Sequence, residues 1–253
     1  MEITAKFQEE YSAKLPALTL LSSLGWRFIS PAQALAARGG KTDEVVLRDE
    51  LRDQLAKRRF SFAGQTHALS AKALDNLIAE ICSPGLNEGL AIANERLYNH
   101  LLYGISVTEF IEGKKANPTI ALIDWQNPAN NSFLFTEEFS VLRSGATESR
   151  RPDIVCFVNG IPLAVIECKS PKIEIEQAVS QNIRNQGDEW IPRLFSSVQL
   201  VMGVNKNAAQ YATTGTPKKF WGVWKEMEDR DSSIEPLVNT SLSDAQKDAL
   251  FSG

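Results

Sequence analysis

Residues 154–169 of the chain are IVCFVNGIPLAVIECK, in which two apolar runs stand on either side of Asn159-Gly160. Asn-Gly is the dipeptide best suited to the left-handed backbone of a tight hairpin turn. Both runs are continuously apolar rather than alternating, which is typical of strands covered on both faces. We therefore expect a hairpin at the centre of a sheet, with further structure packed on each side.

The chain around this hairpin contains the other parts of an α/β fold. A helical pattern follows the hairpin at residues 174–186. Apolar runs bounded by polar turns predict strands at residues 105–111, 119–125, 133–141, 198–205, 211–216 and 219–225. Strands, then a helix, then further strands predict a central mixed β-sheet flanked by helices.

The first 104 residues are predicted to be mainly helical, and residues 105–225 to form the sheet-rich core. Apolar periodicity places helices at residues 47–59, 71–82 and 87–103. Thr42, followed by two acids, is expected to open the first, and Ser70 to cap the second. Gly104 is expected to end the third.

Composition excludes several classes of protein. The 253 residues include 43% hydrophobic residues and 23% charged residues, as in a folded globular chain. The 2 His and 3 Cys form no spacing typical of a zinc site, and the separated cysteines indicate no disulfide framework. The first residues mix charges with apolar groups, unlike a signal peptide, and no apolar run approaches the about 20 residues that span a membrane. We expect a cytoplasmic protein with no membrane association.

The end of the chain differs in composition from the predicted core. Residues 226–242 are polar and acidic and are predicted to be a linker. Ser243 and Gln246 have the spacing of a helix-capping box, so residues 243–253 are expected to begin a further, truncated domain.

Charged residues border the central hairpin, where buried charge is costly. Asp153 precedes its first strand after Arg151-Pro152, and Glu167-Cys168-Lys169 closes its second. Two carboxylates placed close together repel unless a cation lies between them, and oxygen ligands of this kind suit Mg²⁺. Lys169 would orient or deprotonate an attacking water, or stabilise charge in the transition state. The arrangement favours phosphodiester hydrolysis, although Glu-x-Lys alone is more often a solvated ion pair.

The register of the hairpin tests this hypothesis. A regular two-residue loop would pair Val158 with Ile161 and would turn Asp153 away from the face that carries Glu167. A three-residue loop, with Gly160 in a bulge position, would pair Phe157 with Ile161 and bring both acids to one face. The nuclease hypothesis therefore predicts an odd loop or a bulge.

The segment RRPDIVCFVNGIPLAVIECKSP resembles the PD-(D/E)xK nuclease motif, and more narrowly the nuclease domain of the restriction subunit of type I restriction–modification enzymes. LIDWQNPANNSF and NERLYNHLLYGISV support the resemblance, which covers most of residues 20–225. It implies a restriction-endonuclease-like core within residues 1–225. It also implies that Asp153 and Glu167 bind Mg²⁺ and that Lys169 is the catalytic lysine.

The resemblance extends to the following helix and to DNA. Gln181 matches the glutamine of the family's Q-x-x-x-Y motif and joins the catalytic set, whereas Asn185 stands where tyrosine is expected and inherits no role. DNA contacts are expected from basic side chains near the motif, namely Arg150, Arg151, Lys172 and Arg184. Eleven bases against seven acids give residues 143–225 a charge of +4, although the whole chain carries −4. Local positive charge is what phosphate contacts require.

The family's other components are expected outside this sequence. No G-x-x-x-x-G-K-[ST] motif occurs, so the ATP-dependent motor is expected beyond Gly253, and the isolated fragment is expected to be weakly active or inactive. Methyltransferase and specificity subunits are the implied protein partners, and double-stranded DNA is the implied substrate. Two alternatives remain open: another PD-(D/E)xK nuclease of repair or junction processing, and a non-catalytic DNA-clamp or docking module.

Overall fold

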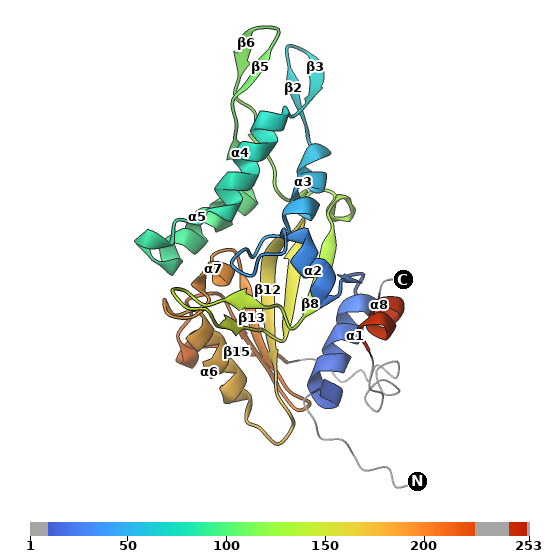
Figure 1. Ribbon diagram of the computed structural model, residues 1–253, viewed down its shortest axis with the longest axis vertical. Helices are drawn as coiled ribbons and strands as arrows, with labels where there is room; N and C mark the ends of the chain where they lie inside the picture. The colour runs from blue at the N-terminus through green and yellow to red at the C-terminus, as the bar shows by residue number, and fades with distance from the viewer. Residues whose placement is uncertain (1–9, 226–242, 252–253) are drawn as a thin grey trace.

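A mixed seven-stranded sheet forms the centre of the molecule (Figure 1). The computed structural model describes residues 10–225 and 243–251. The strands, in spatial order, are β1 (Arg27–Phe28), β8 (Phe133–Glu137), β11 (Ile154–Val158), β12 (Ile161–Cys168), β13 (Leu200–Val204), β14 (Ala209–Ala212) and β15 (Gly222–Val223). The pairs β1–β8 and β12–β13 are parallel and the others antiparallel. The expected α/β fold with a central mixed sheet and flanking helices is confirmed.

The predicted hairpin is β11–β12, and it lies in the middle of this sheet. β8 pairs with β11 on one side and β13 pairs with β12 on the other. On one face, Leu15 and Leu18 of α1 (Leu15–Ser23) join a buried cluster with Ile154. On the other face, Val179 of α6 (Ile175–Asn185) packs in a cluster with Val165. Both faces are covered, which explains why both strands are continuously apolar.

The helices account for most of the remaining structure. The other helical segments are η1 (Glu10–Lys14), α2 (Pro31–Ala37), α3 (Arg48–Ala56), α4 (Ala71–Cys82), η2 (Leu86–Glu88), α5 (Leu90–Tyr103), η3 (Pro128–Asn130), α7 (Pro192–Phe195), η4 (Lys218–Phe220) and α8 (Asp244–Phe251). The predicted caps of α4 and α5 are confirmed. Ser70 Oγ accepts a hydrogen bond from the Ala73 N–H, and Gly104 ends α5 with a positive φ of 78°.

The helix predicted at residues 47–59 is expected to open at Thr42. That start is wrong, because the corresponding helix, α3, begins at Arg48. Val45, Val46 and Leu47 are buried in a non-helical segment instead. The Leu47 N–H donates to the Gly160 carbonyl at 2.8 Å, so this segment is tied to the turn of the central hairpin. A tertiary contact has therefore overridden the local capping signal.

The first third of the chain also contains strands that the helical prediction missed. β1 joins the central sheet, and β2 (Arg59–Phe62) forms a hairpin with β3 (Gln65–Ala68). A similar hairpin joins β5 (Glu109–Ile111) to β6 (Lys114–Ala116). These two hairpins project together beyond α3 and α4, at the top of Figure 1.

Several predicted strands are shorter than expected. The segment 105–111 divides into β4 (Ile105–Ser106) and β5, and 119–125 contains only β7 (Thr119–Ile120). β8 ends at Glu137, and two further short strands, β9 (Val141–Leu142) and β10 (Ser149–Arg150), pair with each other outside the main sheet. Polar turns interrupt these segments, so their apolar residues reach the core without forming long ladders.

The last described helix packs against the core. The predicted capping box is confirmed, since the Gln246 N–H donates to Ser243 Oγ and the Ser243 N–H donates to Gln246 Oε1. α8 contacts α1 and β1 (Figure 1), and the buried ammonium of Lys247 lies 2.5 Å from the buried carboxylate of Glu137. The predicted linker at 226–242 lies outside the described residues. No helix within the described ranges is long and apolar enough to cross a membrane.

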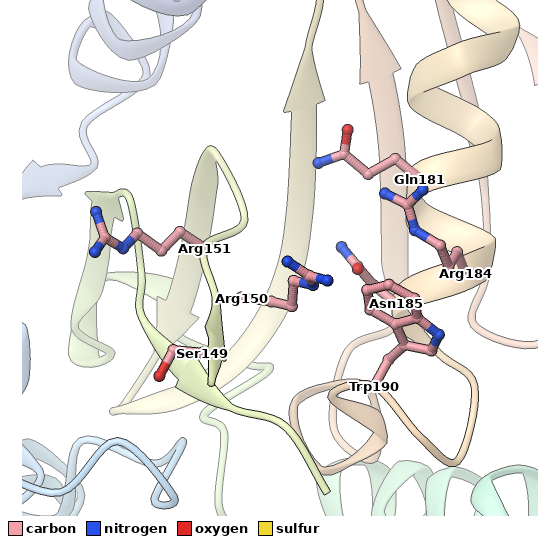
Figure 2. A pocket seen from close by; sticks show the side chains of 7 residues that line it. All are labelled: Ser149, Arg150, Arg151, Gln181, Arg184, Asn185 and Trp190. Carbon is pink, nitrogen blue, oxygen red and sulfur yellow. The ribbon is translucent and has the colours of Figure 1, made fainter. Parts of the chain in front are cut away.

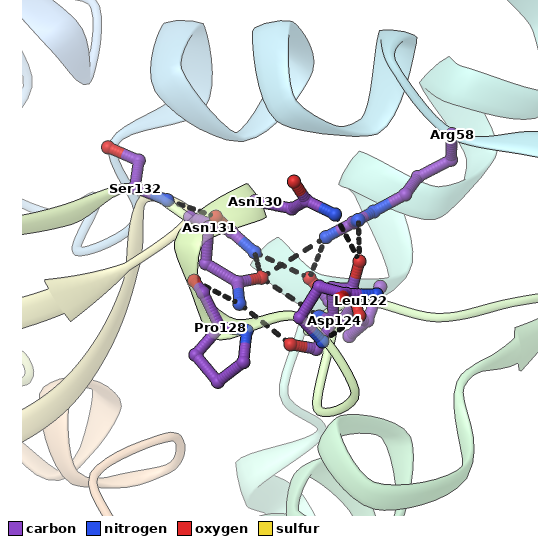
Figure 3. Close-up of polar contacts among 9 residues, drawn as sticks. Arg58, Leu122, Asp124, Pro128, Asn130, Asn131 and Ser132 are labelled. Atoms are coloured by element: carbon purple, nitrogen blue, oxygen red, sulfur yellow. Dashed lines mark hydrogen bonds and ion pairs between the residues drawn. The ribbon is translucent and has the colours of Figure 1, made fainter.

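An asparagine-rich loop supports the turn of the central hairpin (Figure 3). Within this loop, Asn131 Nδ2 donates to the carbonyls of Asp124 and Pro128, and its Oδ1 accepts from the Asp124 N–H. A hydrogen bond from Asn130 to the Asp124 carboxylate, with another from the Asn127 N–H, holds the pKa of Asp124 below its ordinary value. Asn131 Oδ1 also accepts from Arg58, in the connection between α3 and β2. The loop is thus cross-linked internally and tied to the helical part.

Asn159 connects this loop to the hairpin turn. Its side chain is fully buried, donates to Leu122 O and Asn131 Oδ1, and accepts from the Ser132 N–H at 2.8 Å. Its φ is +52°, in the left-handed region that asparagine tolerates better than most residues. Gly160 follows at +82°, and a Cβ there would lie only 2.6 Å from Leu47 O. Both turn residues are therefore required by their surroundings.

We expect Asn159→Ala to lower the free energy of unfolding by about 2–4 kcal/mol, because it leaves buried polar groups without a hydrogen-bond partner and strains the backbone. Asn159→Gly removes the same side-chain bonds but relieves the strain, so its loss should be smaller by about 1 kcal/mol. Urea denaturation of the three proteins measures both differences. Equal stability of all three would contradict the role given to this turn.

Candidate functional site

The register of the central hairpin decides where its charged ends lie. The turn contains only Asn159 and Gly160, so Val158 pairs with Ile161 and Phe157 with Pro162. The predicted three-residue loop is therefore wrong, because Asn159 itself adopts the left-handed conformation of a two-residue turn. The register then shifts, and Cys156 pairs with Ala164. Leu163 is left as the extra residue of a β-bulge, which is the other outcome that the nuclease hypothesis allowed.

The bulge brings Asp153 and Glu167 to the same face of the sheet. Beyond it, Ile154 pairs with Ile166, so the preceding Asp153 lies opposite Glu167. Directly opposed residues in an antiparallel pair share a face. The two acids lie on the face of Val155 and Val165, which α6 covers. Asp153 Oδ2 accepts a hydrogen bond from the Cys168 N–H at 2.7 Å, which ties the two strand ends together.

Glu167 is a fully buried carboxylate at the centre of this site. Gln181 Nε2 donates to Glu167 Oε2 at 2.7 Å, and Asn185 Nδ2 lies 3.3 Å from Oε1. Both amides come from α6, where a spacing of four residues places them on one face. Gln181, expected in the catalytic set, is therefore in direct contact with Glu167.

Asn185 is a site residue that the sequence did not reveal, because its departure from the family tyrosine left it without a role. The i, i+4 spacing from Gln181 was the signal that could have indicated a shared contact. Its side chain is buried, and its Oδ1 has no hydrogen-bond partner among the described residues. Asn185 therefore contributes one contact to Glu167 and retains an unused acceptor.

Lys169 follows the last residue of β12. Its backbone N–H donates to Val204 O, which extends the pairing with β13 by one residue. Its ammonium donates to the Cys168 carbonyl at 2.7 Å, and the residue is half-buried. The site therefore gathers Asp153, Glu167 and Lys169 at one end of the central hairpin.

A basic pocket of about 490 Å³ borders these acids (Figure 2). Its lining residues are Ser149, Arg150, Arg151, Gln181, Arg184, Asn185 and Trp190. Three of the four predicted DNA-binding residues thus meet in one pocket that also contains both amide partners of Glu167. The fourth, Lys172, is exposed in the connection between β12 and α6 and does not line the pocket.

The donors available for a metal ion are mainly carboxylate oxygens. Within residues 10–225 and 243–251, no three or more His, Cys, Asp and Glu side chains cluster in a way that could hold a metal. Asp153 and Glu167 are a pair of oxygen donors, and Mg²⁺ commonly binds through one or two carboxylates while it keeps waters and takes phosphate oxygens. The residues present fit Mg²⁺ better than a metal that needs a full protein cage.

The fold and site define an α/β protein with a buried acidic pair beside a basic pocket. Comparison with known families matches residues 6–220 to the model described as type I restriction enzyme R protein N terminus. The chain therefore belongs to this family, as the hairpin motif indicated.

Individual relatives agree with the family. The chain is 28% identical to the putative type I restriction enzyme MjaIXP endonuclease subunit of Methanocaldococcus jannaschii, over 90% of this chain and 21% of that protein. It is 26% identical to the type I restriction enzyme HindI endonuclease subunit of Haemophilus influenzae, over 89% of this chain and 21% of that protein. The chain spans about a fifth of the length of these relatives.

We expect none of the cysteines to react in the folded protein, although Cys168 stands between Glu167 and Lys169. All three are buried, and Cys168 packs in the cluster on the opposite face of the sheet. Burial raises the pKa of Cys82 to about 11 and that of Cys156 to about 12, so neither forms the reactive thiolate near pH 8. A thiol-disulfide reagent should label no cysteine in buffer and all three in denaturant. Fast labelling of one cysteine in the native protein would contradict the described packing.

Proposed function

We propose that the chain is the Mg²⁺-dependent endonuclease part of a type I restriction subunit and cleaves DNA phosphodiester bonds. Family membership and the endonuclease-subunit names of the relatives support a restriction nuclease role. The observation that carries the proposal is the bulge at Leu163, which brings Asp153 and Glu167 to one face beside Lys169. This is the arrangement expected of a PD-(D/E)xK site.

Asp153 and Glu167 would hold the metal ion in this proposal. When bound, Mg²⁺ lowers the pKa of an attacking water and neutralises charge that develops on the phosphate. The Cys168 N–H holds Oδ2 of Asp153, so this carboxylate is oriented before any ion binds. The amides of Gln181 and Asn185 orient Glu167 in the same way. Amide donors stabilise a carboxylate without cancelling its charge, so these contacts do not neutralise it.

Lys169 is the proposed proton-handling residue. Its ammonium lies at the same strand end as the acids, where it can orient the attacking water or stabilise the negative transition state. Gln181 acts through Glu167 and is therefore a positioning residue within the catalytic set. Asn185 takes the same part in place of the family tyrosine.

DNA is the proposed substrate, and the basic side chains around the pocket are its proposed contacts. Arg150, Arg151 and Arg184 line the pocket beside the acids, and Lys172 lies in the connection that leads from β12 to α6. The charge of +4 over residues 143–225 supports binding to the phosphate backbone, which needs no particular base sequence.

Site choice and translocation are proposed to come from other components. Specificity and methyltransferase subunits would select the DNA, and an ATP-dependent motor in the remaining length of the subunit would deliver it. The same proposal explains why the chain by itself would cut weakly or not at all. A repair-type nuclease would not depend on these partners, so efficient cleavage by the chain alone would favour that alternative. The variants below separate a catalytic site from a non-catalytic clamp.

We expect Asp153→Asn and Lys169→Ala to reduce DNA cleavage by the assembled restriction complex by about a hundredfold or more. ATP hydrolysis and DNA binding should stay at the unmodified level, because neither depends on these groups. Glu95→Gln is a matched control, since Glu95 is an exposed acid on α5. Undiminished cutting by either site variant would show that the acidic hairpin is structural.

Metal binding can be measured without cleavage. Calorimetric titration of the chain with Mg²⁺ should show binding that Asp153→Asn and Glu167→Gln abolish. Gln181→Ala and Asn185→Ala should weaken it by about tenfold, because each removes a hydrogen bond that orients Glu167. If all four variants bound Mg²⁺ with the affinity of the unmodified chain, the metal would bind elsewhere.

A further inference from the structure

Three guanidinium groups surround the indole ring of Trp190. The Cζ atoms of Arg150, Arg143 and Arg184 lie 4.4, 4.7 and 4.9 Å from the ring centroid, within the range of cation–π attraction. Figure 2 shows Arg150 and Arg184 converging on Trp190 from opposite sides of the pocket, whereas Arg151 extends away. The ring thus gathers positive charge from three separate segments.

The charges of these arginines are not equally compensated. Arg143 donates to the Glu148 carboxylate at 3.1 Å and to the Glu189 carbonyl at 3.1 Å. Arg150 and Arg184 form no ion pair with any acid in the described parts of the chain. The Nε of Arg150 is buried and has no hydrogen-bond partner in these same parts. Arg150 and Arg184 therefore bring to the pocket two positive charges that no acid of the described residues compensates.

The backbone holds Trp190 in place before any ligand arrives. Its N–H donates to Gly187 O at 2.9 Å, and its carbonyl accepts from the Ser144 N–H at 2.8 Å. The first bond closes the turn that follows α6, and the second ties that turn to the segment between Arg143 and Arg150. The indole is therefore a fixed platform between the elements that carry the arginines.

The pocket chemistry selects an anion. Among the described residues, none that lines the pocket is acidic, and two carry the uncompensated guanidiniums. The guanidinium fork matches the oxygens of a phosphate. The indole is already engaged by guanidiniums, so it supports the arginines rather than offering a free face to a base. Gln181 and Asn185 line the pocket and also contact Glu167, which places the anion beside the acidic pair.

The geometry points to a second phosphate subsite, in which Arg150 and Arg184 bind the DNA phosphodiester next to the one at Asp153 and Glu167. Trp190 is its positioning residue. This inference rests on the proposed function, because the ligand is a neighbouring phosphate of the same DNA. The subsite sets the register of the strand on the acidic centre without reading its bases.

Duplex binding tests the subsite directly. The chain is titrated into a fluorescent 20-base-pair duplex in EDTA, which removes any contribution from the metal site, and fluorescence anisotropy is measured over a range of salt concentrations. Arg150→Gln and Arg184→Gln should each weaken binding by about fivefold and reduce the slope of log K against log salt by about 1. Arg143→Gln is the matched control, because Arg143 contacts the same indole ring but its guanidinium is already paired with Glu148. The slope measured for this variant should not change.

The role of Trp190 has a separate signature. Trp190→Leu should weaken binding as much as an arginine variant and add little further loss when combined with Arg150→Gln. Trp190→Phe keeps an aromatic face and should restore most of the affinity. Additive losses in the combined variant would show that Trp190 acts independently of the arginines and would overturn its positioning role.

The failures of the two proposals can be told apart. Unchanged slopes in the Arg150 and Arg184 variants, or an equal loss in Arg143→Gln, would overturn the subsite while leaving the metal titration unaffected. Lack of duplex binding by the unmodified chain would also overturn it. Failure of the unmodified chain to bind Mg²⁺, or Mg²⁺ binding that Asp153→Asn and Glu167→Gln leave unchanged, would overturn the proposed catalysis; with the slopes as expected, the phosphate-binding surface would remain.

Discussion

The single extra residue at Leu163 is the constraint on which the site depends. Side chains alternate along a strand, so one residue of register decides which face each acid occupies. A two-residue turn alone would have placed Asp153 and Glu167 on opposite faces of the sheet. The bulge shifts the register by one residue between the turn and the strand ends, so that the two acids come to one face, while Val158 and Ile161 stay buried. The fold thus retains a tight turn and still brings the acids together.

Buried carboxylates lie on both faces of the same sheet and receive different partners. Glu137 of β8 pairs in register with Ile154, and it lies close to the ammonium groups of Lys14 and Lys247. Glu167 of β12 receives amides from α6. An ammonium cancels the charge of a buried carboxylate, and such a pair fixes α8 against the core. Amides orient a carboxylate but preserve its charge, which suits a group proposed to bind a cation.

The net charge of −4 is the sum of a positively charged part and a negatively charged part of the chain. The part from residue 143 to 225 carries +4, so the rest carries −8. The structure concentrates part of this positive charge further, because Trp190 draws guanidiniums from β10, from α6 and from the loop after β9. Positive and negative groups then meet at one site, since the arginines line the pocket and the pocket residues Gln181 and Asn185 also contact Glu167.

The amino-acid sequence by itself determined the features that depend on neighbouring residues. The apolar runs around Asn159-Gly160 predicted a central hairpin, Ser70 and Gly104 marked helix ends, and the spacing of Asp153, Glu167 and Lys169 indicated the candidate site. Only the tertiary structure decided the bulge at Leu163, the start of α3 at Arg48 and the contact of Asn185 with Glu167. These depend on groups far apart in the chain: Leu47 bonds to Gly160, and α6 packs across β12. Local patterns specify turns, caps and faces, but register and side-chain partners follow from how the whole core packs.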